Sequence, residues 1–225
     1  MAKKEEVKAE EIHDIQGALT SAEAFIEKNQ KVILIGLGVV VLFVLAVLGF
    51  KTYYLEPREL AAQNEMYKSQ NAFAVDSFKI ALEGKGIESI GFIEIASEYG
   101  FTATGKLANA YAGICLYKLG KYEEAIEYLE KYRSDDTHLG VSTLGLIGDC
   151  YVNLNQNEEA IKAFEKAIDC KNDVLSPVYL KKLGLVYESL KDLVNAEKAY
   201  TSIKEKYPKS AEAADVDKYL ARVQK

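Results

Sequence analysis

The sequence has no tryptophan, three prolines, three cysteines and two histidines among its 225 residues. So few prolines allow long uninterrupted helices. The two histidines, His13 and His138, lie far apart, without a further histidine or cysteine at metal-ligand spacing, so we expect no metal site. No CxxC pair occurs either. We therefore expect Cys115, Cys150 and Cys170 to be buried free thiols.

The sequence also lacks the residue patterns that enzymes use. It shows no nucleophile–histidine arrangement, and its glycine-containing apolar stretch near the amino terminus does not have the context of a phosphate loop. Its paired acids fall at predicted helix starts or in turns, where they complement the helix dipole or meet water. We therefore expect no enzyme, no catalytic residue, no cofactor and no small-molecule substrate.

The net charge is −6, and the acidic residues are spread along the whole chain. No block of lysines or arginines and no basic helix face occurs, so nucleic acid is not an expected partner. The composition is 49% hydrophobic and 28% charged, which is typical of a folded helical chain rather than a disordered one.

Residues 32–50 form an apolar run of 19 residues without a charged side chain. As a helix this run is about 28 Å long, close to the thickness of a bilayer's hydrocarbon core. Lys31 precedes the run, and Lys51, Tyr53 and Tyr54 follow it. Because lysine and tyrosine favour the headgroup layer, the pattern predicts a single transmembrane helix.

Two alternatives to a membrane span remain open. A buried soluble helix needs a core that surrounds it on all sides, which a short repeat array does not supply. A cleaved signal peptide is the other alternative, but the 31 residues before the run carry seven acids against five lysines. The flanking charges do not decide the orientation, since Lys28 and Lys31 balance Lys51 and Arg58.

The segment before the run is predicted to be an amphipathic helix, with Thr20 or Ser21 as a cap inside it. A stripe next to a span is expected to lie on the membrane surface, and binding to a partner is the alternative. The stripe consists of Ile12, Ile15, Leu19, Ala22, Phe25 and Ile26.

Three similar segments recur at intervals of 35 and 36 residues: LGKYEEAIEYLEKY at 119–132, LNQNEEAIKAFEKA at 154–167 and LKDLVNAEKAYTSI at 190–203. Each belongs to a unit of two predicted helices. A small residue in each helix allows the two backbones to approach, and a large residue fills the gap beside it. One such pair cannot bury its apolar faces alone, so the pattern predicts a stacked solenoid. The predicted first helices are 106–118, 141–153 and 177–190, and the second helices are 121–133, 157–169 and 193–206.

When the three units are aligned, the residues at equivalent positions resemble those of the tetratricopeptide repeat family. The columns that define the repeat are Gly113, Gly148 and Gly184; Ala125, Ala160 and Ala196; Leu129, Phe164 and Tyr200; and the closing Pro208. The second and third units depart from the pattern, because Asn155 and Lys191 stand where the first unit has Gly120.

Both flanks of the repeats are predicted to be helical as well. Residues 92–108 align with 200–216, which predicts a helix at 88–99 that belongs to a degenerate unit. Its partner is expected within 58–82, with Met66, Tyr67, Phe73 and Phe78 inward. A terminal helix at 210–223 is expected to cover the last unit through Ala211, Ala214, Tyr219 and Val223.

The expected fold class is therefore all-α, with one amino-terminal transmembrane helix followed by a tetratricopeptide-type solenoid. The predicted parts are a cytoplasmic amphipathic tail at 1–31, the span at 32–50, a linker helix with the degenerate repeat at 51–105, three repeats at 106–209 and a capping helix at 210–225.

The resemblance implies that the first helix of each repeat lines a concave groove that binds protein. The implied groove residues are Ile114, Tyr117, Lys118, Asp149, Val152, Asn153, Lys181, Leu185 and Glu188, together with Ala110, Gly145 and Ser189. This mixture suits an extended or partly unfolded polypeptide, and a solvated face without a ligand is the alternative. Some members of the family bind the carboxylate tails of chaperones through a lysine–asparagine pair. Ala110 and Ile114 stand at those two positions here, so this carboxylate clamp is excluded.

The segment AFIEKNQKVILIG, followed by the span and the repeats, resembles the ancillary subunit family of the bacterial SecYEG translocon. This resemblance implies an inner-membrane protein with a cytoplasmic amino terminus and a periplasmic repeat domain. The implied partners are translocon subunits, a membrane chaperone or secreted polypeptides. A structural scaffold between membrane complexes, or a cytosol-facing adaptor that resembles an import receptor, remains as an alternative.

Overall fold

The computed structural model describes residues 2–132 and 138–224, with side chains described from Phe25 onward apart from that of Ile26. The chain divides into two compact units, Met1–Glu56 and Pro57–Lys225. All regular elements in the described ranges are helices, apart from an isolated bridge between Gly84 and Ile90. The predicted all-α class is confirmed.

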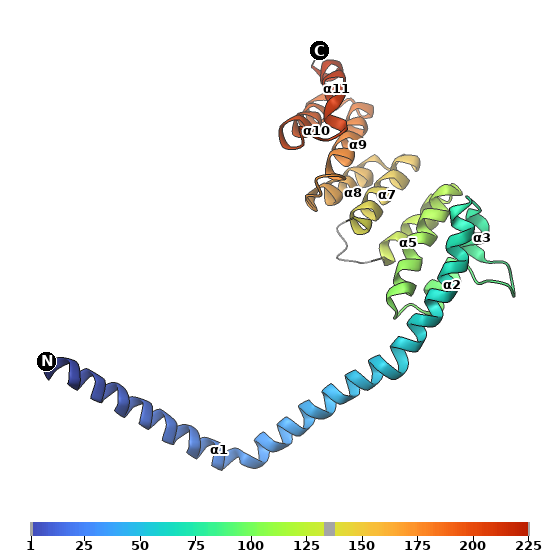
Figure 1. Ribbon diagram of the computed structural model, residues 1–225. Coiled ribbons are helices and arrows are strands. Elements are labelled where there is room, and N and C mark those ends of the chain that lie inside the picture. The colour runs from blue at the N-terminus through green and yellow to red at the C-terminus, as the bar shows by residue number, and fades with distance from the viewer. Residues whose placement is uncertain (1, 133–137, 225) are drawn as a thin grey trace. The chain divides into compact units, whose positions relative to one another are not determined.

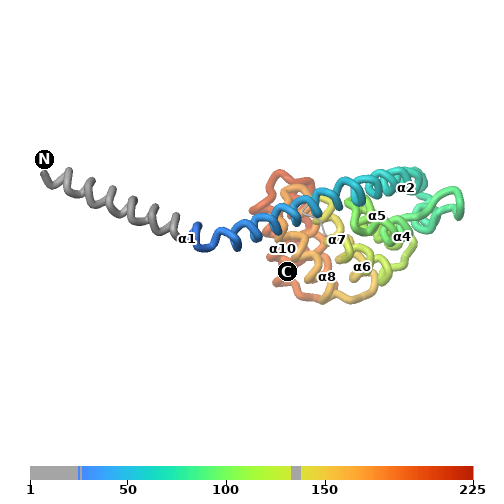
Figure 2. The backbone as a smooth tube through the Cα atoms, turned by 90° about the horizontal axis from the view of Figure 1, so that it is seen from below, coloured from blue at the N-terminus to red at the C-terminus, as the bar shows by residue number. Residues whose placement is uncertain are grey.

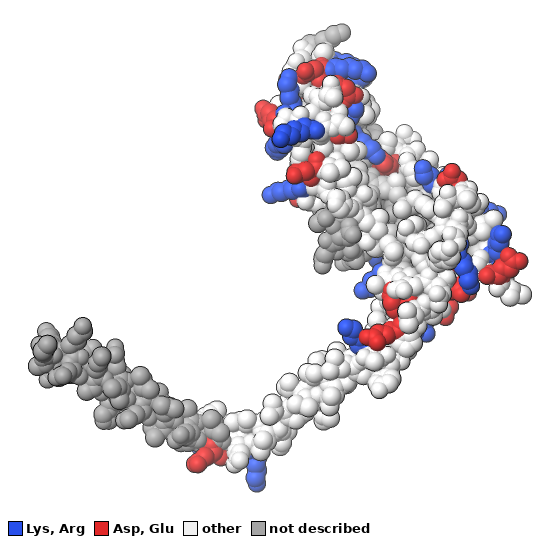
Figure 3. Space-filling view, in the orientation of Figure 1, with Lys and Arg blue, Asp and Glu red and all other residues white. Residues whose placement is uncertain are grey.

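The first unit is built from helix α1, Ala2–Phe50, and the π-helical segment η1, Lys51–Leu55. Residues 32–48 are exposed along their whole length. The apolar stretch carries no charged side chain (Figure 3). It is long and apolar enough to cross a membrane, which makes α1 a candidate span.

Helix α1 continues without interruption through residues 20 and 21. The predicted cap at Thr20 or Ser21 is therefore wrong, because no helix begins there. The predicted apolar stripe falls on side chains outside the described ones, except for Phe25, which is exposed.

The second unit contains three consecutive helix pairs (Figures 1 and 2). Within each pair the two helices pack together, and the second helix also packs against the first helix of the next pair. This is the stacking that the repeat pattern predicts, and every helix begins and ends within three residues of its predicted bounds. The pairs are α5 Ala103–Lys118 with α6 Tyr122–Lys131, α7 Leu139–Asn153 with α8 Asn157–Asp169, and α9 Ser176–Ser189 with α10 Leu193–Lys206.

Each pair is closed by a glycine that faces a large side chain. A Cβ on Gly113 would lie 2.5 Å from Leu129 Cγ, and one on Gly148 would lie 2.5 Å from Phe164 Cε1. A Cβ on Gly184 would likewise collide with the ring of Tyr200. The alanine column, Ala125, Ala160 and Ala196, is fully buried. Small residues therefore set the close approach of the helices in all three units.

The turn inside each pair has the same shape in all three units, although its residue differs. Gly120, Asn155 and Lys191 have φ values of 76°, 58° and 61°. Each donates its backbone N–H across 3.0 Å to the carbonyl three residues earlier. The second and third units therefore keep the left-handed turn without a glycine, which is easier for asparagine than for lysine.

The region before the repeats consists of α2, Glu56–Ala74, α3, Phe78–Glu83, and α4, Phe92–Glu98. Phe92 and Ile95 on α4 are fully buried, as are Tyr200 and Ile203, the residues with which the sequence aligns them. The aromatic ring of Phe73 on α2 lies 6.3 Å from that of Phe92, so α2 and α4 share one core. The sequence predicts this region to be a degenerate unit of the solenoid, and we keep that name for it below.

The degenerate unit differs in detail from its predicted form. The segment 58–82, within which one partner helix was expected, is divided between α2 and α3, and the helix expected at 88–99 begins only at Phe92. A loop separates α3 from α4, and Gly91 packs too closely on Leu82 to accommodate a Cβ. Tyr67 was expected to face inward but is 66% exposed. It directly follows the buried Met66, and successive residues of an α-helix point about 100° apart, so only Met66 faces the core.

The carboxy-terminal cap is shorter than predicted. A 3-10 turn, η2, spans Glu212–Ala214, and helix α11 spans only Val216–Val223. Ala211 and Ala214 precede this helix and are exposed, so their predicted covering role is wrong. The cap instead buries Val216, Leu220 and Val223, which recur at the helical spacing of four and three residues.

Two of the three cysteines are buried thiols, as expected. Burial raises the pKa of Cys115 and of Cys150 to about 12, which keeps both thiols protonated and unreactive near neutral pH. Cys170 is exposed, contrary to the expectation, because it lies at the carboxy-terminal cap of α8 rather than on its inner face.

Candidate protein-binding surface

The nine predicted groove residues all lie on α5, α7 and α9, the first helices of the three pairs. We refer to these nine residues as the A-helix surface. Lys118, Val152, Asn153 and Leu185 are exposed, and the other five are half-buried. Ala110 and Gly145 were expected on the same face but are buried; the ring of Tyr179, on the next first helix, covers Gly145.

On α5, Tyr117 faces the neighbouring helix α7. Burial raises the pKa of the Tyr117 phenol, the nearby carboxylate of Asp149 raises it further, and a hydrogen bond with Asn153 partly offsets the shift. The ring of Tyr117 lies 5.7 Å from that of Tyr122 at the start of α6. Tyr117, Asp149 and Asn153 therefore come together, and Tyr117 remains neutral at physiological pH.

Asp149 also joins α7 to α9. Its carboxylate accepts hydrogen bonds from Lys182 Nζ at 2.6 and 2.8 Å. Lys182 was not among the predicted residues, although it lies 33 residues after Asp149, close to one repeat length. A search for opposite charges one repeat apart would have found this pair.

The last repeat is joined to the cap in the same way. Lys181 donates to both carboxylate oxygens of Asp215 at 2.9 and 3.0 Å, and this hydrogen bonding raises the pKa of Lys181. Glu188 accepts hydrogen bonds from Arg222 at 2.7 Å and from the Tyr200 hydroxyl at 2.5 Å. These charged groups on the A-helix surface therefore fix the stacking of successive helices.

Apart from the exposed Lys118, what remains accessible on this surface is apolar or neutral. Val152 is 38% exposed and Leu185 is 42% exposed, on consecutive first helices. Tyr117 and Ile114 add half-buried apolar surface from α5. The A-helix surface therefore combines ion pairs to neighbouring elements with partly exposed apolar side chains.

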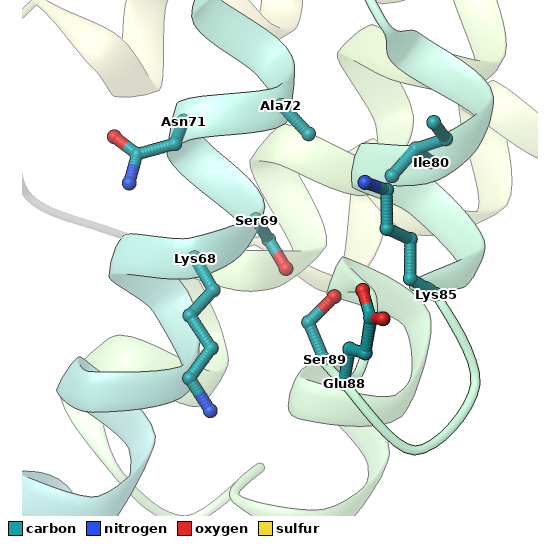
Figure 4. Close-up of a pocket in the computed structure, with 8 residues that line it drawn as sticks. All are labelled: Lys68, Ser69, Asn71, Ala72, Ile80, Lys85, Glu88 and Ser89. Carbon is teal, nitrogen blue, oxygen red and sulfur yellow. The ribbon is translucent and has the colours of Figure 1, made fainter.

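A second candidate site is an open pocket of about 380 Å³ between α2, α3 and the loop that follows α3 (Figure 4). Its charged lining residues are Lys68, Lys85 and Glu88. Lys68 forms an ion pair of 2.8 Å with Glu65 on its own helix. The lining contains no histidine and no cysteine.

Within the part of the chain that the structure describes, no group of three or more histidine, cysteine, aspartate or glutamate side chains is close enough to hold an ion. His138 instead lies 3.5 Å from the side-chain amide of Asn172, measured from Nδ1.

Comparison with family models finds two matches within the second unit. Residues 182–210 match the tetratricopeptide repeat model, and residues 94–167 match the model described as anaphase-promoting complex, cyclosome, subunit 3. The repeat domain is a tetratricopeptide-type helical solenoid. Such repeats are protein–protein interaction modules, so the coarse expectation of a protein-binding domain is confirmed.

Comparison with solved structures finds a similar fold in the MamA protein. The MamA protein matches with a TM-score of 0.53 and 19% sequence identity, over 72% of this chain and 80% of MamA. The C-terminal part of a TPR repeat-containing protein from Cytophaga hutchinsonii matches with 15% identity and a TM-score of 0.35, over 72% of this chain and 78% of that one. A comparison with curated proteins finds no match.

Proposed function

We propose that the chain is a membrane-anchored protein-binding factor that holds polypeptide segments on the A-helix surface. The observation that carries the proposal is the partial exposure of Val152 and Leu185 on neighbouring first helices of a tetratricopeptide-type solenoid. Ion pairs already occupy Asp149, Lys181 and Glu188, so the contact with a partner falls to the apolar residues. Extended or partly unfolded segments present the apolar groups that such a surface accepts.

The anchor in this proposal is residues 32–50 of α1, of which residues 32–48 are exposed along their whole length. Anchoring raises the effective concentration of the surface near a membrane partner, so contacts that are weak in solution become useful. The resemblance to the ancillary translocon subunits supports a place beside the bacterial secretion channel. In this arrangement the tail is cytoplasmic, the repeats are periplasmic and the polypeptides held are newly secreted ones.

Site-specific photo-crosslinking tests the proposal. A photoreactive amino acid at position 152 or 185 is expected to crosslink to many polypeptides in intact cells. The control positions are Lys162 and Lys166, exposed residues on the second helix α8, where few crosslinks are expected. Equal yields at all four positions would show that the A-helix surface is not the binding site.

The crosslinked partners separate the proposed function from its alternatives. A holding factor gives many partners in small amounts, because each contact is weak and short-lived. One abundant partner at fixed stoichiometry would identify a structural scaffold instead. A variant that carries Val152→Asp and Leu185→Asp is expected to lose most crosslinks while it retains its helical content, because both side chains are exposed.

A further inference from the structure

Helix α2 has a second face that the repeat domain does not use. One side of the helix is buried in the degenerate unit through Ala62, Met66 and Ser69. The opposite side is exposed at every position of a regular stripe, with Leu60 at 63% and Tyr67 at 66% exposure. We call this stripe the α2 seam; it consists of Leu60, Asn64, Tyr67, Asn71 and Ala74.

The α2 seam has the spacing of a coiled coil. Its residues are separated by alternating steps of four and three, which places Leu60, Tyr67 and Ala74 at d positions and Asn64 and Asn71 at a positions of a heptad. The buried residues Ala62 and Ser69 fall at f positions, on the far side of the helix from the seam. Packing on the repeat domain therefore leaves the seam open for a second helix.

The asparagines identify the kind of helix that fits. No hydrogen bond from either amide to another part of the described chain is present, and Figure 4 shows the Asn71 side chain directed away from α3 and its loop. An apolar partner would leave both amides without hydrogen bonds when it covered them. In a parallel, in-register pair of identical helices, each asparagine meets its own counterpart, which supplies both a donor and an acceptor.

We propose that the α2 seam pairs with the seam of a second copy of this chain as a short parallel two-stranded coiled coil. The flanking e and g positions are compatible with this pairing, because neutral Gln63 lies against Lys68 of the partner helix without a like-charge contact, and the position opposite Gln70 lies beyond the end of α2. Two buried asparagine positions restrict the assembly to dimers and fix its register.

The pairing is weak in solution and depends on the membrane. The seam covers two heptads, so its interface lies below the roughly 1,200 Å² that stable complexes bury. The dependence on the membrane rests on the proposed anchor. In two chains anchored in one bilayer, the same number of residues separates each span from its α2 helix, so the two seams can align in register. Confinement to the bilayer raises the effective concentration of the seams and favours the parallel arrangement.

Cysteine crosslinking of the full chain tests the pairing. The background is Cys170→Ser, which removes the exposed native thiol and leaves the two buried ones. Single substitutions Leu60→Cys, Tyr67→Cys and Ala74→Cys are reconstituted in phosphatidylcholine vesicles and treated with a short bismaleimide. The control is Lys162→Cys on α8, which is also exposed. All three seam positions are expected to give dimers at least about tenfold faster than the control.

Each other outcome overturns the proposal. Dimers at position 67 alone would show an antiparallel pair that crosses at Tyr67. Equal rates at the seam and at position 162 would show random collision, and products larger than dimers would show another assembly. A second variant, Asn64→Lys with Asn71→Lys, places like charges at the a positions and is expected to reduce crosslinking of Tyr67→Cys to the control rate.

Flotation of the same samples separates this proposal from the proposed anchor. If the chain floats with the vesicles and the seam shows no preference, the pairing is wrong and the anchor stands. If the chain does not float, the crosslinking is repeated in concentrated solution, where a preference for positions 60, 67 and 74 would still support the seam. Absence of that preference would overturn the pairing there as well.

Discussion

The three regular units and the degenerate unit before them are held together in different ways. In each regular unit a glycine on the first helix contacts a large side chain on the second, as Gly148 does with Phe164. The degenerate unit uses contacts between distant parts of the chain instead. The Arg58 side chain donates a hydrogen bond of 2.6 Å to the backbone carbonyl of Glu98. The Ser69 hydroxyl donates one of 2.7 Å to the backbone carbonyl of Ile90.

The difference shows which features a solenoid can lose. The degenerate unit has no glycine column, yet Phe92 fills the same place in its core as Tyr200 fills in the last unit. The ring of Phe92 lies 5.0 Å from that of Tyr111 on α5, so the degenerate unit shares its core with the first regular unit. The large residue of the second helix therefore persists. The close backbone contact is made at Gly91, before the second helix, and polar contacts join distant segments of the unit.

The largest expected effect comes from removing that large residue in both kinds of unit. Phe92→Ala and Phe164→Ala are each expected to lower the free energy of unfolding by about 3–5 kcal/mol, because both rings are fully buried. Urea unfolding followed by circular dichroism measures the change. A cost for Phe92→Ala below about 1 kcal/mol would show that the degenerate unit is a linker outside the cooperative core.

The glycine contact is specific to the regular units, and Gly148→Leu tests it. The new side chain would collide with the ring of Phe164, so we expect a loss of about 1–3 kcal/mol in the free energy of unfolding. Lys162→Leu on the packed helix α8 is the control, since that position is exposed and should change stability by less than about 0.5 kcal/mol. Similar effects of both changes would contradict the role of the glycine column.

The polar attachment of the degenerate unit is tested at Glu59. Its carboxylate accepts hydrogen bonds from the backbone N–H of Thr104 at 3.2 Å and from the Thr104 hydroxyl at 2.5 Å. Glu59→Gln is expected to cost about 1 kcal/mol of unfolding free energy near neutral pH, because the amide satisfies these donors less well. Thermal unfolding of both chains between pH 3 and pH 8 measures the difference.

The pH dependence of this contact follows from the pKa of Glu59. Burial alone would raise it, but the hydrogen bonds from Thr104 and Gln63 outweigh burial and lower the pKa below its usual value of 4.5. The stabilisation is therefore complete above the unfolded pKa and is lost as the pH falls through the lower folded value. The difference between the two chains should shrink below about pH 4.5, and a difference that grows in acid would contradict the assignment.

The smallest effect is expected at the turns of the regular units. Lys191→Gly should stabilise the chain by about 0.5–1 kcal/mol, because lysine adopts the left-handed conformation at a cost that glycine does not have. Asn155→Gly should change stability by only a few tenths of a kcal/mol, since asparagine tolerates this conformation. A larger gain at Asn155 than at Lys191, measured by thermal unfolding, would contradict this explanation.

The repeat periodicity predicted the regular units closely, because each unit repeats the same small and large residues at fixed spacing. The degenerate unit was predicted only in part. Its alignment identified Phe92 and Ile95, but the break at Ala74 and the loop before Phe92 interrupt the period, so Tyr67 was assigned to the wrong face. An insertion of this kind leaves no counterpart in the other units from which its shape can be read.

The sequence predicted which helices carry the residues of the candidate surface, but it did not predict the ion pairs that several of them form. The family register places Asp149, Lys181 and Glu188 on the first helices, where they lie, yet all three are occupied by ion pairs to neighbouring helices. Their partners Lys182, Asp215 and Arg222 lie 33 or 34 residues later. Inspection of one repeat position at a time does not reveal such pairs, because the partner charge lies in the next repeat or in the cap.

Protease accessibility in intact bacterial spheroplasts is the most direct test of an anchored surface on the outer side of the membrane. A protease added outside is expected to digest residues 57–225 and to leave the span and the tail protected. Resistance of the repeat domain until the membrane is broken would place it in the cytosol and contradict the proposed secretion-linked function. Recovery of the whole chain in the soluble fraction would contradict the anchor itself.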